Sequence, residues 1–146
     1  MGTQQILLIV LSVIIVGIAI VVGIMMFNNG AYNANKQQIA SELTHYGSIV
    51  AQWWKTPVAQ GGAGQNPTNL NIADIADYVG FNEANYSISN SDVGEFRITA
   101  ASQADTTVTL TGLGTASKLG IHPKVTTTII LSEISIVATT EDDDNF

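Results

Sequence analysis

The chain has 146 residues, enough for one small domain with an appendage and too few for a typical two-domain enzyme. Hydrophobic residues make up 46% of it and charged residues only 12%, about half the charged share of ordinary soluble domains. With 5 Lys and Arg against 12 Asp and Glu, few basic side chains are available for phosphate contacts, so nucleic-acid binding is not expected. Because cysteine is absent, disulfides, thiolate metal sites and a cysteine nucleophile are excluded.

Residues 6–27 form an uninterrupted apolar run, ILLIVLSVIIVGIAIVVGIMMF, in which Ser12 is the most polar side chain. About 20 apolar residues in a helix cross the hydrocarbon of a bilayer. A cleaved signal peptide would have a basic start, a shorter apolar run and a small-residue cleavage site, so we expect an uncleaved anchor. The first charged side chain, Lys36, lies too far beyond the run to fix the orientation of the anchor.

A second helical pattern covers residues 31–54, after Asn28, Asn29 and Gly30, where we expect the helix to break or thin. Pro57 ends this second pattern. If the two segments are collinear, about 50 helical residues make a rod on the order of 75 Å long. The apolar side chains of the second segment recur at steps of three and four, which predicts one face packed on a sheet. These residues are Tyr32, Ile39, Leu43, Tyr46, Val50 and Trp53.

For the rest of the chain, the sequence pattern predicts a loop over residues 60–71, then a short helix over residues 71–80 that covers one edge of the domain, and then strands. The strands are expected at residues 86–89, 95–101, 106–111 and 124–139, with the last segment long enough to turn near Ser132 and Glu133 and form two strands. The predicted fold class is therefore α+β, with a long N-terminal hydrophobic and amphipathic helix packed on a small antiparallel sheet of about three to five strands.

The pattern predicts two parts of the chain, a transmembrane or filament-core helix over residues 1–30 and a second part over residues 31–146. The second part contains the amphipathic continuation of the helix and the globular antiparallel β domain. The acidic end, residues 141–146, is expected to be solvated.

No arrangement of chemically active residues points to catalysis. His45 and His122 have no partner at a metal-binding spacing, so we expect them to be structural. The segments 61–64 and 112–114 are glycine-rich but lack the rest of a phosphate-loop motif, so we expect turns. We predict that the protein is not an enzyme and has no catalytic residues, cofactor or metal.

Three further surface features have simple interpretations. Asp74 and Asp77 share one face of the short helix, where paired carboxylates usually serve solvation. Asn85 opens the sequence Asn-Tyr-Ser and is a candidate glycosylation site. Of Trp53 and Trp54, we expect one to pack on the sheet and the other to meet a neighbour or a carbohydrate.

A short polar start, a long charge-free helix, an amphipathic continuation and a Thr- and Gly-rich antiparallel sheet together resemble the type IV pilin-like superfamily. The likeness is architectural over the whole chain and closest in residues 1–30, where MGTQQ precedes the apolar run. Two features depart from the pilin pattern. Only Met1 and Gly2 stand where pilins have a basic leader, and Leu7 stands where pilins usually carry a glutamate.

The resemblance implies a structural subunit of an extracellular type IV pilus-like helical filament, with roles such as cell adhesion or motility. The implied partners are other copies of the chain, the inner membrane before assembly and the pilus assembly machinery. The implied location is a surface filament, with a membrane-anchored precursor pool. Assembly would use the N-terminal helix, where Gln4 and Gln5 could hydrogen-bond neighbouring subunits without burying a charge. The residues expected in assembly are Gln4, Gln5, Ile6, Leu7, Ile9, Val10, Ile14, Gly17, Val21, Gly23 and Phe27.

Two alternatives remain. A pseudopilin of a type II secretion system would share the fold and form a short periplasmic filament. A monomeric membrane-tethered binding domain would use the helix only as an anchor, with Trp54 and the sheet holding a ligand.

Overall fold

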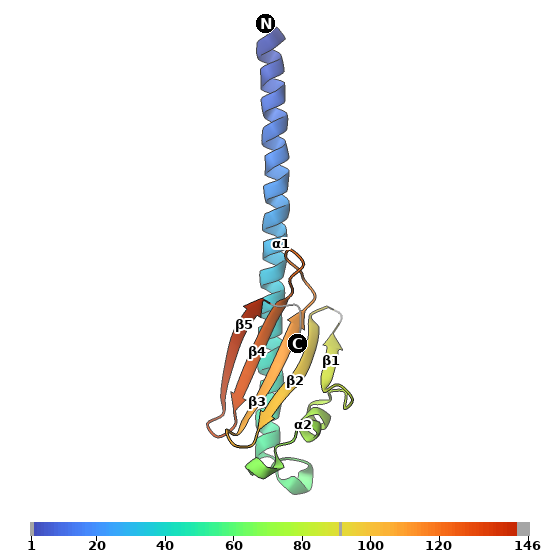
Figure 1. Cartoon of the computed structure of the whole chain (residues 1–146), viewed down its shortest axis with the longest axis vertical. Helices are drawn as coiled ribbons and strands as arrows, with labels where there is room; N and C mark the ends of the chain where they lie inside the picture. The colour runs from blue at the N-terminus through green and yellow to red at the C-terminus, as the bar shows by residue number, and fades with distance from the viewer. Residues whose placement is uncertain (1, 91, 143–146) are drawn as a thin grey trace.

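A computed structural model describes residues 2–90 and 92–142. Its longest element is α1 (Gly2–Lys55), a helix of 54 residues whose length is about 80 Å at 1.5 Å per residue. Figure 1 shows that the C-terminal half of α1 packs on a β-sheet, while the N-terminal half projects beyond it. The fold class is α+β, as the sequence predicts.

The expected break at Asn28, Asn29 and Gly30 is wrong, because α1 is continuous through these residues. All three are exposed, so the helix backbone there meets no steric conflict with the domain. A glycine within a helix costs about 1 kcal/mol relative to alanine, which a helix of this length can absorb. The apolar run and the amphipathic segment therefore form one continuous helix.

The helix ends at Lys55, two residues before Pro57, because a proline disfavours helical geometry in the residue that precedes it. The loop that follows contains two single turns of 3-10 helix, Val58–Gln60 and Pro67–Asn69. The predicted short helix is α2 (Ile72–Val79). The side chain of Asn71 caps its first turn by accepting from the amide of Ala73, and Gly80 ends it in the left-handed conformation, with φ of 86°.

The sheet has five strands in the order β1-β2-β3-β4-β5, and each neighbouring pair is antiparallel. They are β1 (Ser87–Asn90), β2 (Gly94–Ser102), β3 (Thr107–Gly114), β4 (Pro123–Ile130) and β5 (Ser135–Asp142). The segment predicted to hold two strands does turn around Ser132 and Glu133, as expected. The strand β5 extends beyond the predicted range, through Glu141 and Asp142. The predicted solvation of the acidic end falls outside what the structure describes. Residues 143–146 lie outside the described residues.

The glycine-rich segment 112–114 is part of β3 and is not the expected turn. Gly112 pairs with Phe96 of β2 and Val125 of β4. A Cβ atom at position 112 would lie 2.5 Å from a methyl carbon of Ile39 on α1. These glycines therefore let the helix approach the strand closely, a role that glycine can play within a sheet.

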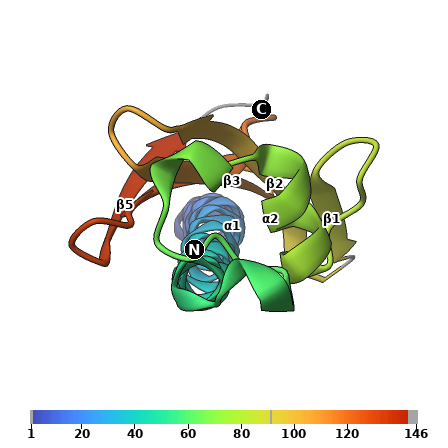
Figure 2. The same ribbon diagram turned by 90° about the horizontal axis from the view of Figure 1, so that it is seen from below.

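The core lies between α1 and the concave side of the sheet. Figure 2 shows α1 end-on beneath this side, with α2 near β1 and β2. Alternate residues of the strands face the helix because side chains of a strand point to opposite faces in turn. The large apolar side chains that are fully or almost fully buried from β2, β3 and β4 are Phe96, Ile98, Val108, Leu110, Val125 and Ile129.

Candidate functional site: the exposed apolar helix

The N-terminal half of α1 stands clear of the rest of the described chain. Every residue from position 2 to position 31 is exposed. The large apolar side chains of residues 6–27 are between 46% (Val22) and 76% (Phe27) exposed, so only the helix itself covers them. Within the described residues, α1 is the one helix long and apolar enough to cross a membrane. This exposed half contains all the residues expected in assembly: Gln4, Gln5, Ile6, Leu7, Ile9, Val10, Ile14, Gly17, Val21, Gly23 and Phe27.

The polar atoms of the apolar run are satisfied within the helix. The hydroxyl of Ser12 donates to the carbonyl of Ile9 at 2.8 Å, and the backbone amides and carbonyls bond within α1. No charged side chain precedes Lys36. Such a segment can enter hydrocarbon, or a bundle of similar helices, without leaving a polar group unpaired.

Gly17 and Gly23 have no packing role within the described chain, because a Cβ atom at either position would meet nothing within 4 Å. Each leaves a shallow site on the helix where another backbone could approach closely.

The domain begins to cover α1 at Tyr32, which is buried. From there on, the residues expected to pack on the sheet lie on the covered face. Ile39, Leu43 and Val50 are completely buried, Trp53 is 1% exposed, and Tyr46 is half-buried at the edge of the same cluster. The helix therefore has two environments, a bare apolar half and a half held by the sheet.

Asn35 is a buried residue that sequence reasoning missed. Its Nδ2 donates to the carbonyl of Val93 at 2.8 Å, and its Oδ1 accepts from the amide of Ala116 at 3.1 Å. These bonds fasten the β1–β2 and β3–β4 connections to α1. Its spacing in the sequence could have indicated its burial, because Asn35 lies three positions after Tyr32 and four before Ile39, on the same helix face as the apolar side chains.

Tyr46 closes the core beside α2 and the sheet. Its ring lies 5.0 Å from the ring of Phe81 and 5.4 Å from that of Phe96, centroid to centroid. Burial raises the pKa of the Tyr46 phenol above its usual 10.0, and the carboxylate of Glu42 raises it further. The neutral phenol is therefore the form that fits this site.

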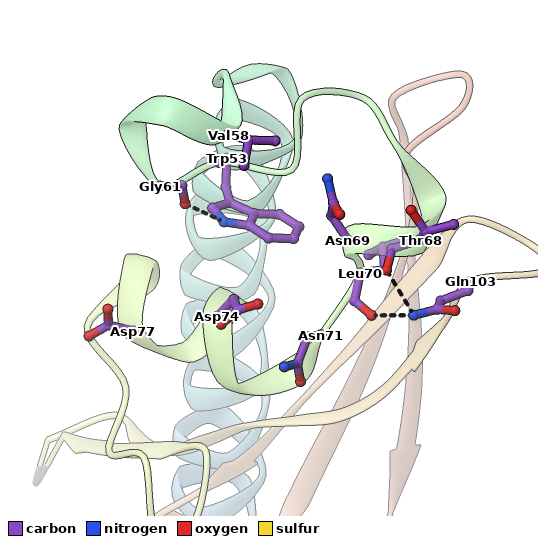
Figure 3. Close-up of a pocket in the computed structure, with 11 residues that line it drawn as sticks. Trp53, Val58, Gly61, Thr68, Asn69, Leu70, Asn71, Asp74, Asp77 and Gln103 are labelled. Atoms are coloured by element: carbon purple, nitrogen blue, oxygen red, sulfur yellow. Dashed lines mark hydrogen bonds between the residues drawn. The ribbon is translucent and has the colours of Figure 1, made fainter.

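A cleft of about 650 Å³ lies at the end of the domain farthest from the N-terminus. Figure 3 shows Trp53 on one side of it and Gln103 on the other. The indole Nε1 donates to the carbonyl of Gly61 at 3.0 Å, and Gln103 Nε2 donates to the carbonyl of Leu70 at 3.0 Å. These bonds fold the glycine-rich loop over the end of α1, so the polar side chains that line the cleft hold the loop in place.

The structure also places the two predicted aspartates and the two histidines. Asp74 and Asp77 are exposed at the rim of the cleft. His45 is exposed on α1, and His122 is half-buried just before β4. Across residues 2–90 and 92–142, no group of three or more His, Asp or Glu is placed to hold a metal ion.

The expectation that one tryptophan points outward is wrong. Trp54 is 6% exposed and Trp53 is 1% exposed, because the loop after Pro57 folds back over both. The amides of Ala63 and Gln65 donate to the carbonyls of Trp53 and Trp54. Asn85, by contrast, is exposed just before β1, where its side chain is accessible.

The chain has a long N-terminal helix packed on a small antiparallel sheet, an arrangement that is compatible with a pilin-like fold. No protein-family model, curated protein or solved structure matches the chain.

Proposed function

We propose that the protein is a structural subunit of a helical, pilus-like surface filament, assembled through the N-terminal half of α1. Before assembly, the same half holds the chain in the inner membrane. The proposal includes no enzymatic activity and no cofactor, and it includes other copies of the chain and an assembly machinery as partners.

The observation that carries the proposal is the exposure of the apolar run on every side. An amphipathic helix hides one face against its own domain, but residues 6–27 have apolar side chains around the whole circumference. Such a helix needs an apolar environment on all sides, which lipid provides before assembly and a bundle of identical helices provides afterwards. The exchange of lipid for helices costs little hydrophobic free energy, because lipid tails are about as apolar as leucine.

The rigid connection between the two halves also supports this function. Because α1 runs unbroken into the domain, the position of the domain is fixed relative to the apolar run. A simple tether has no need of such a connection. When copies pack head to tail, a fixed offset between core helix and outer domain repeats at each step and gives an open helical assembly.

The departures from pilins define which form of assembly is proposed. Leu7 carries no charge that could pair with a neighbour's amino terminus, so the proposed assembly has no ion pair at this position. Gln4 and Gln5, both exposed in the first turns of α1, are the polar groups available for contacts between subunits. Hydrogen bonds between such amides need no buried charge.

The test is to shear the surface of cells that produce the chain and to examine the sheared and membrane fractions by negative-stain electron microscopy. The variant Ile14→Asp places a charge at the middle of the apolar run, where it costs roughly 2.5–3.5 kcal/mol in a bilayer. The control Gln38→Asp adds the same charge at an exposed position on the covered half of α1.

We expect filaments from the unchanged chain and from Gln38→Asp, and none from Ile14→Asp. Filaments found only in the periplasm would support a pseudopilin instead. A monodisperse small particle in the membrane fraction, with no filaments in any sample, would contradict the proposal in favour of a tethered domain.

A further inference from the structure

The β3–β4 connection carries an unusual apolar residue at its tip. Residues 118–121 form a tight turn, in which Lys118 and Ile121 exchange two backbone hydrogen bonds of 2.9 and 3.0 Å. Leu119 and Gly120 occupy the two central positions. The side chain of Leu119 is 94% exposed, the highest value for a large apolar side chain among the described residues.

Leu119 is also an unfavourable choice for the backbone of this turn. Its φ is +56° and that of Gly120 is +85°, the pattern of a two-residue turn in which asparagine followed by glycine is preferred. A leucine with positive φ carries a conformational cost, and an exposed leucine gains nothing from burial to offset it. In water, the residue at position 119 has neither a backbone nor a packing reason to be leucine.

The turn lies beside the end of the apolar run. Leu119 shares a hollow of about 200 Å³ with Met25, Asn28 and Asn29 of α1. Figure 1 shows the β3–β4 connection reaching along α1 toward the N-terminus. The opposite turn, between β4 and β5, lies at the other end of the sheet, away from the apolar run.

The length of the apolar run places this hollow at the surface of a bilayer. About 22 residues at roughly 1.5 Å each span about 33 Å, slightly more than a hydrocarbon core of about 30 Å. If the run spans the core, Met25 and Phe27 lie at its boundary, and Leu119 lies at the same level. Lys118 and Lys36 line a second hollow on this side, together with Tyr32.

We propose that residues 118–121 are a second membrane contact of the membrane-held chain, in which Leu119 enters the interfacial region of a phospholipid bilayer. Lys118 extends from the same turn to the level of the lipid phosphates, as lysine commonly does at interfaces. The contact fixes the depth of α1 in the bilayer and limits the tilt of the whole chain relative to the membrane. This inference rests on the membrane-held state within the proposed function.

Because the chain has no cysteine, single-cysteine variants can test this contact in the full chain. Leu119→Cys, Ser132→Cys and Ile14→Cys are each labelled with an environment-sensitive fluorophore and placed in phosphatidylcholine nanodiscs that contain nitroxide lipids. Ser132 is exposed in the β4–β5 turn and serves as the control for position in the domain. Ile14 reports whether the helix itself is in the bilayer.

We expect a blue shift and loss of fluorescence through nitroxide quenching for the labels at positions 119 and 14, and neither change at position 132. A water-like, unquenched label at position 119 beside a quenched label at position 14 would overturn this inference and leave the membrane-held helix intact. An unquenched label at position 14 would overturn the membrane-held state itself.

A second comparison moves the label to a neighbouring position, so that Leu119 itself can be kept or replaced. A label on Ser117→Cys, which lines the same hollow, is measured with Leu119 present and with Leu119→Asp. We expect quenching at position 117 to fall when the leucine is replaced. Equal quenching in both chains would show that the leucine side chain does not hold the turn at the membrane.

Discussion

Gly114 of β3 lies directly against the side-chain amide of Asn35 on α1. A Cβ atom at position 114 would overlap the oxygen Oδ1 of Asn35, so glycine leaves the space that this buried amide occupies. From this position Asn35 bonds to the backbone of Val93 and of Ala116, on two different connections. This contact lies where the covered half of α1 begins, so it helps to hold the domain in register with the bare half.

Replacing Asn35 with alanine should destabilise the domain by about 2–4 kcal/mol, because a backbone carbonyl and a backbone amide lose their partner in a largely buried site. The measurement is thermal unfolding of the full chain in detergent micelles, followed by near-UV circular dichroism of the buried tryptophans. Asn33→Ala, at an exposed position on the same helix, should change the stability by no more than about 0.5 kcal/mol. Equal effects of the two variants would contradict this role of Asn35.

Gly112→Ala should destabilise the domain by about 1–3 kcal/mol, because overpacking a core forces neighbouring side chains or the backbone to move. The added methyl group would press on Ile39 and would also lie 3.0 Å from a ring carbon of Phe96. The matched variant Gly30→Ala makes the same chemical change on the exposed part of α1, where a Cβ atom meets nothing within 4 Å. It should stabilise the helix by up to about 1 kcal/mol. Loss of stability in Gly30→Ala would argue against the continuous helix.

The free energy of unfolding should fall as the pH rises above 10. Because the pKa of Tyr46 is raised in the folded chain, the unfolded chain loses its phenol proton at lower pH than the folded chain does. The stability associated with this group is therefore fully present below pH 10 and is lost as the pH rises through the folded pKa. Chemical denaturation at a series of pH values should show a steeper decline for the unchanged chain than for Tyr46→Phe. Parallel curves would show that the pKa of Tyr46 is not raised by folding.

Replacing both Gln4 and Gln5 with leucine should lower the yield of filaments and leave the membrane pool unchanged. The change removes the amides available between subunits, while the apolar run still suits a bilayer. Quantitative blotting measures the ratio of the amount of chain in the sheared fraction to the amount in the membrane fraction. The double variant of Gln37 and Gln38 to leucine, also exposed on α1, controls for added hydrophobicity. An unchanged ratio after replacement of Gln4 and Gln5 would exclude them from assembly.

The sequence is most informative where a periodic pattern meets a local signal. Apolar residues spaced three and four positions apart identify the covered face of α1 around Leu43. Asn71 and Gly80 mark the two ends of α2. The split of residues 124–139 into β4 and β5 also follows from strand length and the polar pair at Ser132 and Glu133.

The features that the sequence could not provide depend on contacts between distant residues. Glycines 112 and 114 belong to a strand because α1 needs space there, and a glycine carries no side chain to show alternation. Asn35 finds partners 58 and 81 positions away, which no local pattern encodes. The turn at Leu119 lacks the preferred asparagine, so nothing marks it as a hairpin.

Assembly through the N-terminal half of α1 is tested most directly by cryo-electron microscopy of material sheared from the surface of cells that produce the chain. We expect helical filaments in which residues 6–27 of neighbouring copies pack around the axis and the five-stranded sheets form the outer surface. Filaments whose axis is built from another protein, or a chain that stays monomeric in the membrane with no filament on the surface, would contradict it.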